Sequence, residues 1–193
     1  MGGVAIYPLK RRVARLGCRN RLHILGFLGL VAFVLVSCTT VAPAEPGEQV
    51  EDLAPDFEIT LFENANHSAG DSLKLSDLKD KPTVLNFWFP SCPPCVAEMP
   101  DLQRAFERHG GDVAFIGVQL VGLDTAANGQ EFVDSLGVTY ALGPDEDGDI
   151  VRDYLIAGFP TTVFLDKDQN VVRKWAGILN EEKLEELIGA ILN

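Results

Sequence analysis

The sequence predicts an α/β domain in which helices cover both faces of a central mixed β-sheet. Three observations lead to this prediction. The runs Thr83–Phe89 and Val113–Leu120 are almost wholly apolar, as expected of strands that are buried on both faces. A segment with helical features follows each run. The later stretch Thr161–Gly177 predicts two strands joined by a tight turn at Lys167–Asn170. This order combines βαβ crossovers with a closing hairpin.

The remaining elements follow from local patterns. Apolar and polar residues alternate over Asp56–Phe62, which predicts a half-buried strand. Glycines end the first helix, and Asn180 is the expected N-cap of the last one, with acidic residues in its first turn. The expected helices are Pro93–His109, Gly129–Gly137, Gly148–Ile156 and Asn180–Leu192.

Charge divides the chain into two unequal parts. Of the 193 residues, 47% are hydrophobic and 23% charged, which is typical of a globular protein. Residues 1–37 hold six of the 16 basic residues and no acidic residue, so 10 basic residues face 28 acidic ones beyond them, a net charge of −18. A domain with this negative charge repels the phosphate backbone of nucleic acids. We therefore expect that its acidic residues form a solvated surface and that it does not bind nucleic acid.

The N-terminal segment has the organisation of an export signal. A basic stretch ends at Arg21, and the apolar run Ile24–Val36 follows, with 13 residues. A membrane-spanning helix needs about 20 residues, whereas the core of a signal peptide needs about 7–15. The next residues, "LVSC" (Leu35–Cys38), resemble a bacterial lipobox, in which the cysteine becomes lipidated and N-terminal. The alternative is a membrane anchor that is never cut.

These features predict three regions. Residues 1–37 are the expected lipoprotein signal peptide, and residues 38–53 comprise the lipidated Cys38 and a flexible tether rich in Pro, Glu and small residues. Residues 54–193 form the folded domain. The lipid would hold this domain at the outer face of the bacterial cytoplasmic membrane.

Four cysteines are present, and their positions favour redox chemistry. Cys18 falls in the predicted signal and Cys38 in the lipobox, which leaves Cys92 and Cys95 with only each other. A zinc site needs four ligands, and the only histidines beyond the signal, His67 and His109, stand far apart in sequence, so no metal is expected. A purely stabilising disulfide is also disfavoured, because a disulfide across so short a loop removes little conformational entropy from the unfolded chain.

The cysteine pair lies where a buried strand meets a helix. Pro93 and Pro94 suit the first helical positions, so Cys92 lies at the helix N-terminus, where free amides and the helix dipole favour a thiolate. Cys95 lies about one turn further, so the two sulfurs can close a disulfide without a backbone change. In Cys-X-X-Cys chemistry the outer thiol attacks and the inner one resolves, so we assign attack to Cys92.

Several motifs together resemble one family. They are "NFWFPSCPPC", Glu98 with Pro100, "GFPTTVFLD" and the closing "WAG" with its helix. The chain resembles the TlpA/ResA-like family of membrane-tethered thiol–disulfide oxidoreductases over residues 54–193. The resemblance implies a thioredoxin-like fold with an N-terminal β extension and a helical insertion. It implies no cofactor besides the redox-active disulfide.

The resemblance also implies roles for single residues. Pro160 should be cis and lie against the disulfide, and Phe159 should offer backbone groups to a bound substrate. Glu98 matches an acidic residue near the active site. Asn86 stands where thioredoxins proper keep a buried Asp, so the proton acceptor is expected on the helix. The alternative for Glu98 is an ordinary solvated charge.

The substrate surface is expected beside the cysteines. Pro93, Pro94 and Trp88 are included in it, although a core role suits Trp88 better. The sequence departs from the family at Ser91, where most relatives have Trp, and this removes an aromatic contact.

The family resemblance leaves the direction of electron flow open. The leading hypothesis is a reductant of protein cysteines, for example those of apocytochrome c, supplied by a membrane electron-transfer partner. The alternatives are an oxidant of secreted proteins and a thioredoxin-like peroxidase. Peroxiredoxins want Thr or Ser where this chain has Phe89. Copper delivery in this fold usually uses a longer cysteine spacing and a downstream histidine, which is absent after His109.

Overall fold

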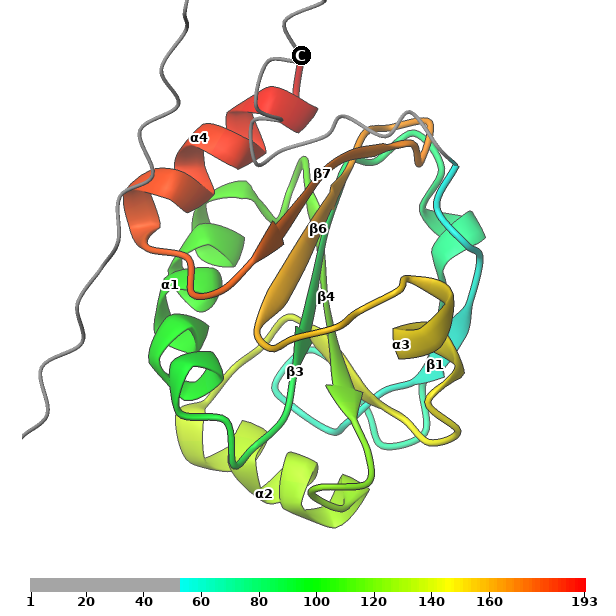
Figure 1. The fold of residues 1–193 in the computed structure, drawn as a ribbon, viewed down its shortest axis with the longest axis vertical. Helices are drawn as coiled ribbons and strands as arrows, with labels where there is room; N and C mark the ends of the chain where they lie inside the picture. Colours follow the sequence, from blue (N-terminus) through cyan, green and yellow to red (C-terminus); the bar gives the residue numbers. More distant parts are fainter. Residues whose placement is uncertain (1–52) are drawn as a thin grey trace, which may run out of the picture. The chain divides into compact units, whose positions relative to one another are not determined.

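The computed structural model describes residues 53–193 (Figure 1). The predicted signal peptide, Cys38 and the tether up to residue 52 lie outside the described residues. The described part begins where Leu53 forms a bridge to Asn170 and the Ala54 N–H donates to the carbonyl of Gln169 at 2.9 Å. Its first residues are thereby attached to the turn between the last two strands. Within residues 53–193, every helix is too short or too polar to cross a membrane.

A mixed sheet of five strands forms the centre of the domain (Figure 1). Its order is β5-β4-β3-β6-β7. Strands β3, β4 and β5 run parallel to one another, whereas β6 pairs antiparallel with both β3 and β7. This confirms the predicted mixture of crossovers and a closing hairpin. The strands are β3 (Thr83–Trp88), β4 (Ala114–Leu120), β5 (Ala141–Asp145), β6 (Thr161–Leu165) and β7 (Val171–Ala176).

Helices cover both faces of this sheet, as predicted. The larger apolar cluster joins one face of the sheet to α1, α2 and α4. The other cluster includes α3, the 3-10 helix η1 and an antiparallel pair of short strands, β1 and β2. The bounds are α1 (Pro93–His109), α2 (Ala126–Leu136), α3 (Asp149–Asp153), α4 (Glu181–Ile191), η1 (Leu75–Leu78), β1 (Glu58–Thr60) and β2 (Ser72–Lys74).

Strand β3 determines which residues lie under α1. All six of its residues are buried, as the apolar run predicted. Because side chains alternate along a strand, Val84 and Trp88 enter the cluster under α1 and α4, while Leu85 and Phe87 enter the opposite one. Asn86, between them, therefore projects a polar amide into the layer beneath α1.

The N-terminal β extension packs on the edge strand β5. The N–H of Phe62 donates to the carbonyl of Leu142 at 2.7 Å. A Cβ at Gly143 would lie 2.2 Å from the carbonyl oxygen of Thr60, so only glycine permits this approach. The extension thus covers an edge of the sheet that is otherwise open to pairing.

The observed elements differ from the predicted ones in several places. Helix α3 covers only Asp149–Asp153 of the predicted Gly148–Ile156, and neither β2 nor η1 was predicted. The strand predicted over Asp56–Phe62 is reduced to the three residues of β1. Helix α2 begins before Gly129, because Thr125 and Asn128 form a capping box. Strand β5 was not predicted, since a Gly-Pro pair interrupts its apolar residues.

Candidate active site

Cys92 and Cys95 form a disulfide at the start of α1, with an S–S distance of 2.04 Å and Cα atoms 5.3 Å apart. Cys92 is the N-cap, and Pro93 and Pro94 occupy the first turn, as predicted. The Cys92 sulfur accepts a hydrogen bond from the N–H of Cys95 at 3.3 Å. The N–H groups in the first turn of a helix have no hydrogen-bond partner within the helix, so the N–H of Cys95 is available to a thiolate at Cys92.

The disulfide is recessed below an exposed rim. Cys95 is 0% exposed and Cys92 only 3%, whereas Ser91, Pro93 and Pro94 are exposed. The exposed fractions of the two sulfur-bearing residues differ by little. The N-cap position of Cys92, rather than its exposure, therefore carries its assignment as the attacking residue.

The segment before β6 contributes the second part of the site. The Phe159–Pro160 peptide bond is cis, as the resemblance implied. The carbonyl of Pro160 accepts the N–H of Gly177 at 2.8 Å, which attaches this turn to the end of β7. The half-buried ring of Phe159 lies edge-on to that of Phe89 at 5.3 Å, and both rings pack against the cluster that contains the two cysteines.

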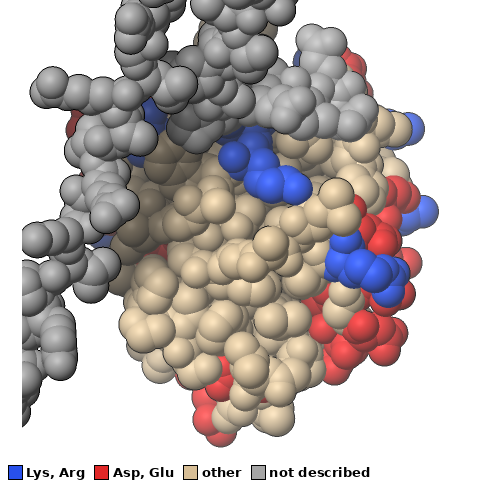
Figure 2. Space-filling view, viewed as in Figure 1, with Lys and Arg blue, Asp and Glu red and all other residues tan. Residues whose placement is uncertain are grey.

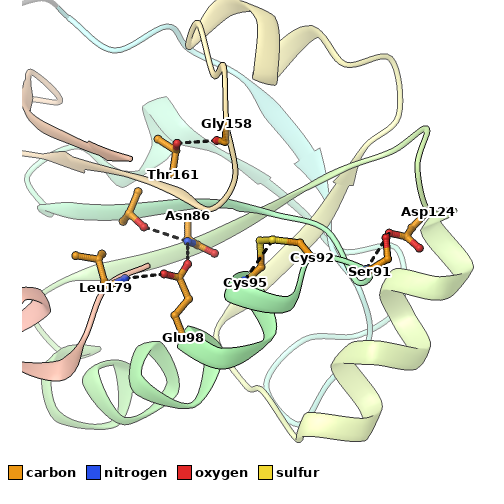
Figure 3. Close-up of a disulfide and its surroundings, with 10 residues drawn as sticks. Asn86, Ser91, Cys92, Cys95, Glu98, Asp124, Gly158, Thr161 and Leu179 are labelled. Carbon is orange, nitrogen blue, oxygen red and sulfur yellow. Dashed lines mark hydrogen bonds between the residues drawn. A yellow bond between two sulfur atoms is a disulfide. The ribbon is translucent and has the colours of Figure 1, made fainter. Parts of the chain in front are cut away.

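Glu98 is fully buried, so its interpretation as a solvated charge is wrong. Its Oε1 accepts from Asn86 Nδ2 at 2.7 Å, and its Oε2 accepts from the Leu179 N–H at 3.0 Å (Figure 3). Burial raises the pKa of Glu98 to about 7. The two hydrogen bonds lower this pKa in part, and the charge of Asp101 adds a small increase. The carboxyl group therefore titrates near neutrality in the folded protein.

Trp88 is not part of a substrate surface. Its side chain is 0% exposed, and its ring packs on that of Phe132 at a centroid distance of 5.2 Å. The assignment of Trp88 to substrate binding is wrong, because the strand alternation that buries Asn86 also turns Trp88 inward.

One contact at the rim was not predicted. Both the N–H and the hydroxyl of Ser91 donate to Asp124, which lies in the loop between β4 and α2 (Figure 3). The two residues are 33 positions apart, and nothing in the sequence pairs them. Among residues 53–193, no group of three or more His, Cys, Asp or Glu side chains is arranged to hold a metal ion.

Comparison with known proteins agrees with this geometry. The model of the AhpC/TSA family matches residues 50–174. Thiol-disulfide oxidoreductase ResA of Oceanobacillus iheyensis is 32% identical over 147 residues, which cover 74% of this chain and 73% of that relative. The chain belongs to the ResA/TlpA-like thiol–disulfide oxidoreductases. Like them, this oxidoreductase has the thioredoxin-like fold.

Solved structures support the assignment of the fold. StoA from Bacillus subtilis matches this oxidoreductase with a TM-score of 0.61 at 24% identity, covering 70% of the chain and 98% of StoA. A secreted disulfide oxidoreductase of Mycobacterium tuberculosis matches with a TM-score of 0.59 at 27% identity, covering 69% of the chain and 95% of that structure.

Proposed function

We propose that this oxidoreductase works outside the cytoplasm, exchanges electrons with protein cysteines through Cys92 and Cys95, and acts as a reductant. Apocytochrome c cysteines, reduced before haem attachment, are the proposed example of a substrate. The observation that carries the proposal is the disulfide itself, closed at the N-cap of α1 beneath an exposed rim.

The proposed reaction has two steps. In the dithiol form, the Cys92 thiolate attacks a substrate disulfide, which forms a mixed disulfide and releases one substrate thiolate. Cys95, as a thiolate, then attacks Cys92, so the second substrate sulfur leaves and the Cys92–Cys95 disulfide returns. Two electrons pass to the substrate, whose two sulfurs take up protons. A membrane-bound dithiol donor must then reduce the protein again.

The rim suits a protein substrate. Phe159 lies just before β6, and its backbone N–H and carbonyl have no hydrogen-bond partner among residues 53–193. An extended substrate segment can pair with them, beside the exposed rings of Pro93 and Pro94. Figure 2 shows charged residues gathered along the side that carries α3 and β1, while much of the remaining surface in that view is uncharged.

The proposed location rests on the N-terminal sequence. The basic stretch, the 13-residue apolar run and the lipobox-like "LVSC" support export and a lipid on Cys38. The relative from Mycobacterium tuberculosis, described as secreted, is consistent with such a location.

We further propose that Glu98 tunes proton transfer at Cys95, the resolving cysteine. It follows Cys95 by three residues on the same helix and is buried with it. A carboxylate nearby disfavours a thiolate, so Glu98→Gln should lower the pKa of Cys95.

Trapping of covalent partners tests the function. Cys95→Ala removes the resolving thiol, so mixed disulfides through Cys92 should accumulate and their partners can be identified by mass spectrometry. Haem-attachment apoproteins among them would support a reductant, and secreted proteins with structural disulfides would support the oxidant alternative. Partners trapped by Cys92→Ala alone would reverse the assigned roles. If neither variant traps a protein, the proposal fails, and peroxide turnover becomes the next assay.

The reduction potential of the Cys92–Cys95 couple tests the direction. Known Cys-X-X-Cys proteins span about 150 mV between reducing and oxidising members. A potential near the reducing end of this range is expected, and one near the oxidising end would contradict the proposed reductant.

A further inference from the structure

The amide oxygen of Asn86 lacks a hydrogen-bond partner. Asn86 lies in the middle of β3 and is 1% exposed. Its Nδ2 donates to Glu98 Oε1 at 2.7 Å and to Thr162 Oγ1 at 3.0 Å, which uses both amide hydrogens. Its Oδ1 is buried and accepts nothing from residues 53–193. An unsatisfied buried acceptor costs about 1–3 kcal/mol and requires an explanation.

Neighbouring groups determine the orientation of this amide. Above the pKa of Glu98, its carboxylate only accepts hydrogen bonds, so it attracts the amide nitrogen and repels the amide oxygen. The nitrogen therefore faces Glu98, and the oxygen must face elsewhere. Figure 3 shows this oxygen directed toward the side on which the Cys92–Cys95 disulfide lies. Cys95 is the more deeply buried cysteine, at 0% exposed.

Reduction creates the donor that this oxygen lacks. A dithiol donor adds two electrons to the S–S bond and becomes a disulfide itself, and the separated sulfurs take up protons. Neutral Cys95 then carries an S–H group, a weak donor, in a place closed to solvent. We propose that Asn86 Oδ1 accepts the S–H of Cys95 in the reduced protein, directly or through one buried water. Asn86 is thus a positioning residue for the resolving thiol.

This contact separates the roles of the two cysteines. A hydrogen bond to the neutral form of a group disfavours its ionised form, so Asn86 raises the pKa of Cys95. The free amide at the start of α1 acts in the opposite direction on Cys92. Cys92 can attack as a thiolate while Cys95 stays protonated. The contact also stabilises the dithiol form relative to the disulfide.

Equilibration with dithiothreitol tests this inference on the full-length protein. Asn86→Ala removes the acceptor from the reduced state and the unsatisfied oxygen from the oxidised state, so both effects disfavour reduction. The equilibrium constant for reduction should fall about fivefold to tenfold. A tenfold fall corresponds to a potential about 30 mV more negative. In a Cys92→Ser background, the pH midpoint of Cys95 alkylation should move to lower pH.

Two controls separate a direct effect from others. Thr162→Val removes the other acceptor of the Asn86 amide and should leave the equilibrium within about twofold of the original. In a Glu98→Gln background, Asn86→Ala should still lower the equilibrium constant. If its effect disappears there, Asn86 acts only through Glu98, and the inference is overturned. An equal shift in Thr162→Val, or none in Asn86→Ala, overturns it as well.

A crystal structure of the reduced wild-type protein needs no substitution. Asn86 Oδ1 should lie within hydrogen-bond distance of Cys95 Sγ or of a water bound to both, and an oxygen bonded elsewhere would refute the contact. The inference rests on the proposed redox role of the pair, but the two fail differently. If the wild-type disulfide does not equilibrate with dithiothreitol, the proposed function fails. If the wild-type disulfide does equilibrate and Asn86→Ala has the same equilibrium constant for reduction, only the inference fails.

Discussion

Ser91, which directly precedes Cys92, holds the carboxylate of Asp124. One carboxylate oxygen accepts both the Ser91 hydroxyl, at 2.7 Å, and the Ser91 N–H, at 3.0 Å. The residue before Cys92 is thereby attached to the loop between β4 and α2. The family resemblance implies Trp at this position, so an anchored carboxylate here would replace an aromatic surface.

We expect this charge to restrain the reactivity of Cys92. Asp124→Asn keeps an oxygen for Ser91 and removes the charge, so a thiolate at Cys92 becomes easier to form and anionic reagents approach more easily. Alkylation of the reduced protein should accelerate about twofold to fivefold with iodoacetate and less with neutral iodoacetamide. The ratio of the two rates, measured at low and high salt, isolates the charge.

Asp168→Asn is the matched control for Asp124→Asn. Asp168 is an exposed aspartate in the turn between β6 and β7, after the end of β6 that lies away from the cis-proline. The reduced Asp168→Asn protein should be alkylated by both reagents at the rates of the wild type. An unchanged iodoacetate-to-iodoacetamide ratio in Asp124→Asn would show that the carboxylate serves only as an anchor.

Local patterns predicted the parts of this fold whose determinants lie in one segment. The run Thr83–Phe89 needed only apolar composition to indicate a central strand, because both its faces are covered. Pro93 and Gly110 marked the two ends of α1. Strand β5 escaped prediction because Gly143 and Pro144 are tolerated at an edge position that only the neighbouring strand defines.

The site divides in the same way. The spacing of Cys92 and Cys95 was visible in sequence. The environment of Glu98 was not, since one of its partners is the backbone N–H of Leu179, 81 residues away, and a backbone group leaves no sequence signal. The Ser91–Asp124 pair depends likewise on where a loop passes.

The contact between the β extension and β5 predicts a site intolerant of side chains. A Cβ at Gly143 would lie 2.2 Å from the Thr60 carbonyl oxygen and 2.8 Å from Ile59. Gly143→Ala should therefore lower the free energy of unfolding by about 1–3 kcal/mol, measured by urea denaturation. Gly111→Ala, with open space around its Cβ, should change it by less than about 0.5 kcal/mol. Equal stabilities for the two variants would show that the extension does not pack on β5 as described.

The lipobox-like sequence predicts a membrane anchor at Cys38. Cys38→Ala should leave a full-length precursor that takes up no radiolabelled palmitate, because the lipidated residue is gone and the signal stays uncut. Cys18→Ala, which changes a cysteine inside the predicted signal, should be processed like the wild type. Normal processing and labelling of the Cys38→Ala protein would exclude this anchor.

The raised pKa of Glu98 predicts an unusual dependence of stability on pH. The folded protein holds the Glu98 proton up to about pH 7, whereas the unfolded chain releases it near 4.5. Between these values the folded state binds more protons, so the free energy of unfolding contributed by Glu98 falls as pH rises, by about 3 kcal/mol in total. Urea denaturation of the oxidised protein from pH 4 to 8 measures this fall, without interference from the disulfide-bonded cysteines.

Glu98→Gln should remove the slope that Glu98 contributes. Glutamine has one acceptor oxygen for two donors, Asn86 Nδ2 and the Leu179 N–H, so this variant also loses about 1–3 kcal/mol at every pH. That loss lowers the free energy of unfolding by the same amount at every pH. Any change in the slope of the curve therefore reports the missing carboxyl group. Glu107→Gln, an exposed change on the same helix, should follow the wild-type curve. Parallel curves for wild type and Glu98→Gln would mean that folding does not change the pKa of Glu98, and its proposed tuning of proton transfer at Cys95 near neutral pH would lose its basis.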